Sequence, residues 1–194
     1  MIGAFSNDDK EQTVEAEVKS EAQDVIVEDT RAESTGKTTP VSGSYGEEIA
    51  RREAIQFECL ALNIYHESRS DNLAGRISVG DVVLNRVDST LYPNTICEVV
   101  QQAQMRTNWK GNVVPVRNMC QFSWWCDGLS DEPLEDDAWE DAQVVAEMVL
   151  RGGWRGISEG ATHYHATYVS PNWVNDRGMV PVGRIGQHKF YRWH

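Results

Sequence analysis

Apolar residues recur at intervals of three and four from Glu47 onward, and this pattern predicts an amphipathic helix that ends in a polar break near Tyr65–Glu67. A second amphipathic helix is expected over about 74–87. Gly75 and Gly80 are unfavourable inside that helix unless backbone or a ligand approaches them closely. The pattern therefore predicts two apolar helices separated by a short polar break.

The middle of the chain alternates between helical periodicity and breaks. A third helix is predicted to start near Pro93 and to run to Ala103, because proline suits the first turn of a helix. The segment 105–116 has no clear period and is expected to be a loop. A further helix is predicted over 131–150, with Pro133 in its first turn.

The final segment changes to the two-residue period of a β-strand. The run ATHYHATYV places His163 and His165 on one face and Tyr164 on the other. A hairpin is expected over 180–193, with Gly186–Gln187 as its two-residue turn. Together these elements predict an α+β fold that is mostly helical and has a small β part.

Composition divides the chain near residue 45. Residues 1–45 are rich in Glu, Asp, Ser and Thr and contain no Trp, so we expect them to be disordered and 46–194 to form the folded domain. The formal net charge is −12, and the first 46 residues supply half of it with ten acids and four bases. Such an acidic chain is not expected to bind nucleic acid without sequence preference.

The chain has no apolar run long enough to span a membrane and no recognisable signal peptide. We therefore expect synthesis in the cytoplasm, with a monomer as the default state. Cys120 and Cys126 bracket five residues and would close a small disulfide loop in an oxidising compartment, whereas free or buried thiols are the alternative in a reducing one. The four cysteines lack the CxxC spacing of a zinc ribbon.

Glu67 is the leading catalytic candidate. It follows an apolar run and lies at the polar break, where partial burial would favour its protonated form and suit a general acid. A solvated glutamate near a helix end is the simpler alternative. Glycosidases usually need a second carboxylate, and Asp71, Asp81 and Asp127 are the candidates for that role, although none is singled out by its neighbours.

Two other clusters carry possible chemistry. His163, His165 and His188 could join Glu67 as zinc ligands, but no HExxH motif is present and ordinary hydrogen-bonding roles are favoured, so we predict no metal. The aromatic run RNMCQFSWWCDG over 117–128 fits a hydrophobic core and a sugar-stacking wall equally well.

Five separated motifs resemble those of the SleB/CwlJ-type cell-wall hydrolases, the family of the spore-cortex-lytic enzymes. In chain order they are ALNIYHESRSDNLAGRISVGDVVLNRV, YPNTICEVV, CQFSWWCDG, GATHYHATYVSPNW and RIGQHKFYR. The resemblance covers about 50–192. It implies a lysozyme-like fold, peptidoglycan as the partner and no cofactor.

The resemblance also implies a lytic transglycosylase, in which the C6 hydroxyl of muramic acid attacks the anomeric carbon and no second carboxylate is needed. The family's catalytic acid corresponds to Glu67. Its QFS motif corresponds to Gln121, Phe122 and Ser123, which would line the substrate groove. The other residues expected to contact substrate are Tyr65, Ser68, Asn85, Arg86, Tyr164 and His165.

Many members of that family carry a secretion signal and a peptidoglycan-binding repeat, and neither is recognisable here. An acidic leader in their place suits a phage lysin that is released through a membrane hole or carried in a virion, and that acts at the cell wall. Two alternatives remain open. One is a zinc amidase that uses the histidines, and the other is a catalytically silent wall-binding or phage component.

Overall fold

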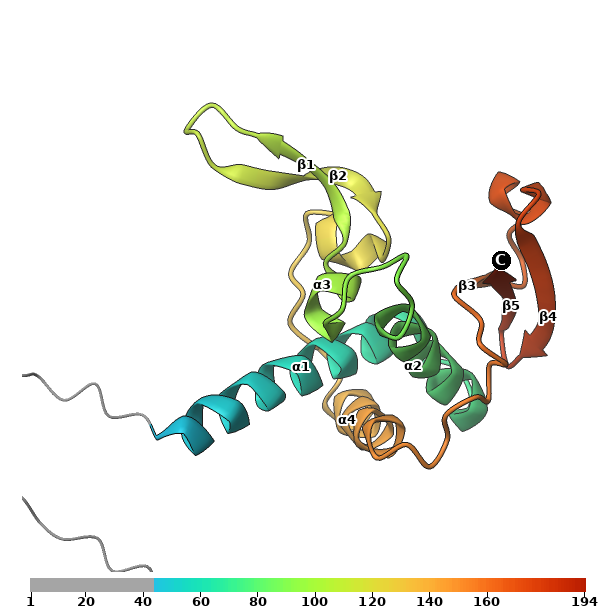
Figure 1. The fold of residues 1–194 in the computed structure, drawn as a ribbon, viewed down its shortest axis with the longest axis horizontal. Coiled ribbons are helices and arrows are strands. Elements are labelled where there is room, and N and C mark those ends of the chain that lie inside the picture. Colours follow the sequence, from blue (N-terminus) through green and yellow to red (C-terminus); the bar gives the residue numbers. More distant parts are fainter. Residues whose placement is uncertain (1–43) are drawn as a thin grey trace, which may run out of the picture. The chain divides into compact units, whose positions relative to one another are not determined.

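The computed structural model describes residues 44–194, which lie within one compact unit, Ser42–His194. The predicted disorder of the acidic leader therefore falls outside the described residues, apart from its last two positions. Among residues 44–194, no helix combines the length and the apolar character that crossing a bilayer requires. The elements in chain order are α1 Tyr45–Ser68, α2 Leu73–Val87, α3 Ile96–Val100, β1 Ala103–Thr107, β2 Val113–Cys120, the 3₁₀ helix η1 Ser123–Cys126, α4 Asp136–Leu150, β3 His163–Ala166, the 3₁₀ helix η2 Asn172–Asn175, β4 Met179–Ile185 and β5 His188–Trp193 (Figure 1).

The helix α1 is fixed at its N-terminus by a capping box. The Ser44 side chain accepts from the Glu47 amide at 3.3 Å, and the Glu47 carboxylate accepts from the Ser44 amide at 2.8 Å. The first half of α1 is mostly exposed, whereas Leu60, Ala61 and Ile64 in its second half are fully buried. Only the second half of the helix therefore belongs to the core.

The three helices α1, α2 and α4 pack against one another in that core, and the short α3 adds Ile96, Val99 and Val100 to it (Figure 1). Gly80 lies where the three helices meet. An added Cβ would be 3.1 Å from Ile64 Cδ1 on α1 and 3.2 Å from Val149 Cγ2 on α4. The structure shows a close approach at Gly80, but side chains make it and not the backbone or ligand that the sequence suggested.

The segment predicted as a helix end and a loop is instead a β-hairpin. β1 and β2 pair antiparallel, with Met105 opposite Pro115 and Thr107 opposite Val113. The predictions of a loop over 105–116 and of a helix extending to Ala103 were wrong. Most side chains of β1 are exposed on both faces, so the strand carries no alternation of apolar and polar residues.

The two flanking helices are shorter than predicted. α3 begins at Ile96, because the Thr95 side chain caps it by accepting from the Glu98 amide at 3.3 Å. α4 begins at Asp136 rather than 131, so Pro133 precedes the helix instead of lying in its first turn.

The C-terminal sheet has the strand order β3-β5-β4 and is antiparallel throughout. Ile185 pairs with His188 across the Gly186–Gln187 turn, which confirms the predicted hairpin. Phe190 of β5 is fully buried and packs with Val82 of α2. The mostly helical α+β fold that the sequence predicts is confirmed.

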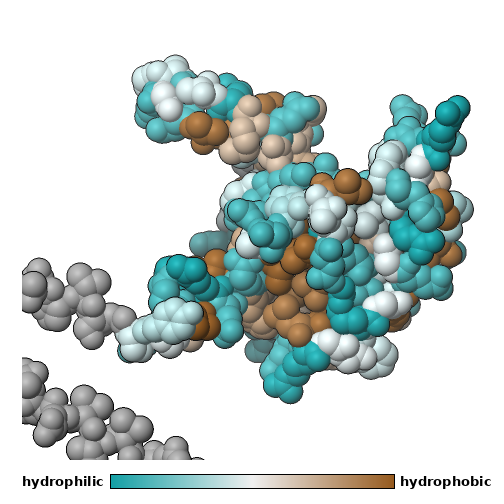
Figure 2. Space-filling view, in the orientation of Figure 1, coloured by the Kyte–Doolittle hydropathy of each residue, from teal (hydrophilic) through white to brown (hydrophobic). Residues whose placement is uncertain are grey.

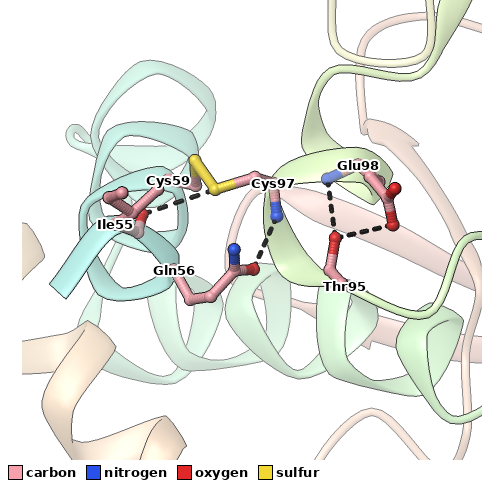
Figure 3. Close-up of a disulfide and its surroundings, with 6 residues drawn as sticks. All are labelled: Ile55, Gln56, Cys59, Thr95, Cys97 and Glu98. Atoms are coloured by element: carbon pink, nitrogen blue, oxygen red, sulfur yellow. Dashed lines mark hydrogen bonds between the residues drawn. A yellow bond between two sulfur atoms is a disulfide. The ribbon is translucent and has the colours of Figure 1, made fainter. Parts of the chain in front are cut away.

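Two disulfides tie the helical part together. Cys59 of α1 bonds to Cys97 of α3, with the two Cα atoms 5.3 Å apart, and the Gln56 side chain accepts from the Cys97 amide at 3.0 Å (Figure 3). Cys120 bonds to Cys126, which is the small loop considered from the sequence. The Cys59–Cys97 pair had no signal in the sequence.

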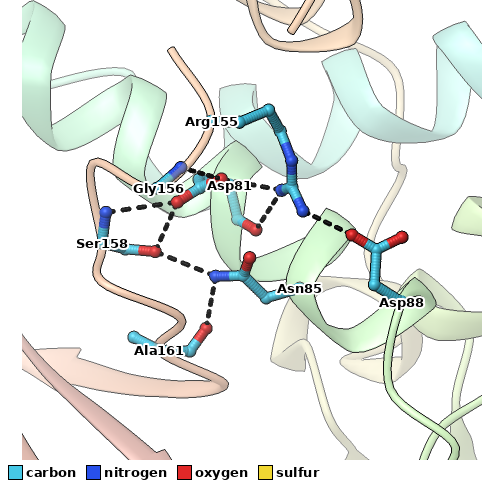
Figure 4. A network of polar contacts seen from close by, with 7 residues as sticks. All are labelled: Asp81, Asn85, Asp88, Arg155, Gly156, Ser158 and Ala161. Carbon is cyan, nitrogen blue, oxygen red and sulfur yellow. Dashed lines mark hydrogen bonds and ion pairs between the residues drawn. The ribbon is translucent and has the colours of Figure 1, made fainter.

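A buried carboxylate joins α2 to the segment 155–161. Asp81 is fully buried and accepts from Arg155 Nη1 at 2.7 Å and from the Ser158 hydroxyl at 2.6 Å (Figure 4). Arg155 also bonds to Asp88 at 2.6 Å. Because these donors occupy both oxygens of Asp81, this carboxylate serves the fold and does not act as a second acid beside Glu67.

Candidate active site

Glu67 lies in the last turn of α1, one residue before the helix ends at Ser68. The helix is continuous through the predicted break, so the carboxyl projects from regular helix rather than from a loop. Its side chain is half-buried and lines a pocket of about 360 Å³. The remaining residues of this pocket, called the Glu67 pocket below, are Tyr65, His66, Arg69, Ser123, Trp124, Asp127, Leu129, Ser130, Asp131, Glu132 and Leu134.

The ionisation of Glu67 depends on three opposing influences. Burial raises the pKa of Glu67, while the hydrogen bond from Tyr164 and the charge of Arg86 act in the lowering direction. Burial is the largest of these, so the pKa of Glu67 lies above its ordinary value. The Tyr164 hydroxyl is 3.2 Å from Glu67 Oε2. Burial also raises the pKa of Tyr164 well above its ordinary value, so its phenol remains a donor.

Arg86 of α2 is held rigidly behind this carboxyl. Its Nε donates to the Thr162 carbonyl at 2.7 Å. The guanidinium carbon is 5.3 Å from the ring centroid of Tyr92 and 5.2 Å from that of Phe122. Among the described residues, the buried Nη1 has no hydrogen-bond partner. Arg86 therefore supplies a positive charge near Glu67 from a buried position.

His66 and Trp124 form an aromatic wall of the Glu67 pocket. Their rings stack with centroids 4.6 Å apart and an angle of 16° between planes. His66 Nε2 lies 3.0 Å from the Asp131 carbonyl, and the Trp124 indole donates to the Asn63 side chain at 3.1 Å. The aromatic run 117–128 thus contributes both to the core and to the pocket wall, so the two interpretations of it are not exclusive.

Three further carboxylates, of Asp127, Asp131 and Glu132, line the Glu67 pocket. Asp127 was a candidate second acid from the sequence, and the structure does bring it to the same pocket. Burial raises the pKa of Asp131, the charge of Asp127 raises it further, and His66 opposes both. Asp71, the other candidate, lies elsewhere. The pocket therefore offers acidic groups at more than one position besides Glu67.

Of the residues expected to contact substrate, the structure brings Tyr65 and Ser123 to the Glu67 pocket and Tyr164 to Glu67 itself. The buried Tyr65 hydroxyl accepts from the amides of Leu134 and Glu135 at 3.0 and 3.2 Å, so it holds the loop that forms one wall. Tyr65 therefore lines the pocket with its side chain, and its hydroxyl positions the loop that forms one wall.

Other expected contact residues lie away from the pocket lining. Asn85 donates to the Ser158 hydroxyl at 3.0 Å and to the Ala161 carbonyl at 2.9 Å, and does not turn back toward Glu67. The buried Ser68 hydroxyl donates to the Ile64 carbonyl of its own helix. Gln121 is exposed and lines a separate depression beside the β1–β2 hairpin, while Phe122 is buried beneath Arg86.

The three histidines considered as metal ligands have separate partners. His165 bonds to the Tyr191 hydroxyl at 3.1 Å, and His188 bonds to Asp71 at 3.1 Å. Burial lowers the pKa of His163 to about 4, which keeps that ring neutral. Within residues 44–194, no group of three or more His, Cys, Asp or Glu side chains is placed to hold a metal ion.

Asp71 is a structural residue whose role the sequence did not reveal. Its buried carboxylate accepts from the amides of Asn72 at 2.7 Å and Gln187 at 2.9 Å, and also from His188. This one side chain thereby joins the α1–α2 connection to the β4–β5 turn. His66 and Asp131 were likewise missed as pocket residues, whereas Trp124 belonged to the aromatic run that was considered as a sugar-stacking wall. For the two missed residues, the position of His66 beside Glu67 was the only local signal.

Comparison with known proteins places these features in a family. The Cell Wall Hydrolase family model matches residues 70–191. The spore cortex-lytic enzyme of Bacillus subtilis (strain 168) is 24% identical over 140 residues, which are 68% of this chain and 35% of that protein. The chain therefore spans about a third of the length of that curated relative.

Two solved structures are similar. One is the catalytic domain of the germination-specific lytic transglycosylase SleB from Bacillus anthracis, with a TM-score of 0.51 and 21% identity over 78% of this chain and 98% of that one. The other is the catalytic domain of SleB from Bacillus cereus, with a TM-score of 0.47 and 21% identity over 81% and 98%. The first shows that this chain has the fold of the SleB catalytic domain.

These matches leave two predictions open. The family match begins at residue 70, so it does not include Glu67, and the role of that carboxyl stays a prediction. None of the relatives named above is a phage protein, and they give no support to the predicted phage origin.

Proposed function

The chain belongs to the Cell Wall Hydrolase family, and from this premise we propose that it is a lytic transglycosylase that cleaves the β-1,4 bond between N-acetylmuramic acid and N-acetylglucosamine in peptidoglycan. One observation carries the proposal. Glu67 is a half-buried carboxyl of raised pKa in a walled pocket, with a tyrosine hydroxyl on one oxygen and a fixed arginine nearby. A carboxyl whose pKa lies above its ordinary value suits a general acid.

The proposed reaction uses Glu67 twice. The protonated carboxyl first gives its proton to the glycosidic oxygen, and the bond from that oxygen to the muramic-acid anomeric carbon breaks. The C6 hydroxyl of the same muramic acid then attacks the anomeric carbon, and its proton passes to the Glu67 carboxylate. The products are a 1,6-anhydro end and a free 4-hydroxyl on the leaving sugar, and the acid is restored.

The surrounding residues have distinct parts in this scheme. Tyr164 stabilises the Glu67 carboxylate after it has lost its proton, because its hydroxyl donates to Oε2. Arg86 adds a positive charge at the same stage, which also favours the ionised carboxylate. His66 and Trp124 present ring surfaces in the pocket, where a sugar ring can pack.

The test is mass spectrometry of muropeptides released from purified sacculi, comparing wild type with Glu67→Gln. Glutamine preserves the shape of the side chain but cannot supply the proton, so we expect the release rate to fall by about 10²–10⁴-fold. Glu58→Gln is the matched control, because it makes the same change at an exposed position of the same helix. Anhydro products from Glu67→Gln at the wild-type rate would contradict the assignment.

A water-using muramidase is the second candidate, and Asp127 and Asp131 in the same pocket favour it. Either carboxylate could activate a water molecule while Glu67 acts as the acid. Reducing-end products in place of anhydro products would establish this alternative. The same spectra distinguish the remaining possibilities, because free stem peptides would indicate an amidase and the absence of products would indicate a wall-binding protein.

The site of action follows from the substrate, so we propose that the protein works at the cell wall. The two disulfides agree with an oxidising, extracytoplasmic environment. Release by phage machinery stays a prediction.

A further inference from the structure

The β1–β2 hairpin differs in charge from the rest of the protein. Between residues 99 and 126 the chain carries three basic residues, Arg106, Lys110 and Arg117, and no acidic one, although the whole chain has a net charge of −12. All three basic side chains are exposed. The hairpin stands away from the helices (Figures 1 and 2), so its positive surface is accessible on more than one side.

The tip of this hairpin presents an aromatic side chain to solvent. Trp109 is 89% exposed, and the Lys110 ammonium nitrogen lies 4.9 Å from its ring centroid. The turn is held by Asn108, whose side chain accepts from the amides of Lys110 at 2.9 Å and Asn112 at 3.0 Å. A large aromatic residue is therefore held exposed on a defined turn, and tryptophan is enriched at binding interfaces.

The base of the hairpin is joined to the Glu67 pocket. The Cys120–Cys126 disulfide connects the end of β2 to η1, which supplies Ser123 and Trp124 to the pocket wall. Arg117 of β2 donates from Nε to the carbonyl of Asp127, another pocket residue, at 2.8 Å. The hairpin is thus held covalently and by a hydrogen bond to the wall of the Glu67 pocket, so a ligand bound to the hairpin lies on an element fixed to that pocket.

We propose that the β1–β2 hairpin is a second peptidoglycan-binding arm, which holds the wall polymer beyond the sugars that occupy the Glu67 pocket. This inference rests on the proposed function for the identity of the polymer. Charge complementarity selects the occupant. Peptidoglycan stem peptides carry free carboxylates, which pair with Lys110 and Arg106, and the Trp109 ring can pack on a sugar face.

The negative charge of the surface beside the Glu67 pocket gives the basic hairpin its importance for binding. Residues 127–141 carry eight acids and no base, and Asp127, Asp131 and Glu132 among them line the Glu67 pocket, so this border of the pocket repels an anionic polymer. The hairpin supplies the compensating attraction. Because its charges are exposed, their contribution to binding is screened as ionic strength increases.

The experiment measures co-sedimentation with purified sacculi in the Glu67→Gln background, so that cleavage does not remove the ligand. Adding Trp109→Ala and Lys110→Glu together is expected to weaken binding at least tenfold and to reduce its dependence on salt. The matched control combines Trp154→Ala with Lys189→Glu, which are an exposed tryptophan and an exposed lysine outside the hairpin, and should bind like the parent. Equal melting temperatures would show that both pairs leave the fold intact.

Unchanged binding by the hairpin variant would overturn the proposal. So would a hairpin-dependent affinity for vesicles of phosphatidylglycerol and phosphatidylcholine that exceeds the affinity for sacculi, because the arm would then serve a lipid surface. The result of this binding experiment does not depend on which reaction the protein catalyses. Hairpin-dependent binding to sacculi, together with no released muropeptides from wild type, would support the arm and refute the transglycosylase.

Discussion

At the scale of single residues, Tyr164 affects the ionisation of Glu67, and this effect can be measured. Its hydroxyl donates to Glu67 Oε2 at 3.2 Å, and this hydrogen bond favours the ionised carboxylate. Tyr164→Phe removes the bond, so the pKa of Glu67 should rise further. A general acid that stays protonated to higher pH moves the alkaline limb of the kcat/KM profile upward in pH. The maximal rate should fall by no more than about tenfold, because the carboxyl itself remains.

The pH profile of Tyr168→Phe provides the control, since Tyr168 is largely exposed and its ring lies at the surface. That profile should match the wild type. An alkaline limb that moves downward in pH in Tyr164→Phe would contradict the assignment of Tyr164 as the donor to an ionised Glu67. If the catalytic acid were another residue, the alkaline limb of the profile would not move in Tyr164→Phe.

What the sequence could predict at this scale depended on whether the signal was local. Glu67 could be singled out from the sequence because an apolar helical run leads directly to it. The role of Asp71 could not be predicted, because its partners Gln187 and His188 are 116 and 117 residues away. His188 was considered as a metal ligand for the same reason, since a list of histidines does not show which carboxylate each one meets.

At the scale of elements, the β4–β5 turn depends on Gly186. Its φ is +55°, and an added Cβ would overlap the Asp71 carboxylate. Gly186→Ala should therefore strain the turn and displace a buried acceptor, at a cost of roughly 2–4 kcal/mol in the free energy of unfolding. Urea denaturation monitored by circular dichroism measures this quantity.

Gly183→Ala is the matched substitution on β4, because no atom lies within 4 Å of the added Cβ. Its free energy of unfolding should stay within about 0.5 kcal/mol of wild type. Similar losses in the two variants would mean that the contact with Asp71 is not what fixes the turn.

Elements with one buried face were predictable, and those without one were not. α2, the core part of α1 and the C-terminal hairpin carry apolar periods that their burial explains. The β1–β2 hairpin was missed because exposure of both faces removes the alternating pattern. The start of α4 was misplaced because residues 131–135, which are acidic and contain a proline, look like a first turn. They are in fact held as a loop by the Tyr65 hydroxyl.

At the scale of the whole molecule, the two disulfides should contribute unequally. Cys59–Cys97 closes a separation of 38 residues and Cys120–Cys126 one of 6. Because the stabilisation grows with the closed loop, replacing the first pair by serines should cost about 4 kcal/mol, against about 2 kcal/mol for the second. Guanidinium denaturation of the two double variants under oxidising conditions compares them.

The same denaturation in the presence of a reductant is the internal check. The wild type should then approach the stability of a variant that lacks both bridges, while the serine variants change less. A larger loss for the Cys120 and Cys126 pair would reverse the expected order. It would indicate that the short bridge supports the pocket wall more than its loop length suggests.

The Asp71 contacts also determine when the site can become complete. A chain is synthesised from its N-terminus, so Glu67, α2 and the pocket wall exist before Tyr164 and long before Gln187 and His188. The carboxylate of Asp71 cannot meet Gln187 and His188 until those residues have emerged, and among the described strands β3, which carries Tyr164, pairs with β5 alone. A nascent or prematurely terminated chain therefore carries Glu67 without the strand that pairs with β3, and on the proposed assignment we expect activity to begin only once synthesis has passed that point.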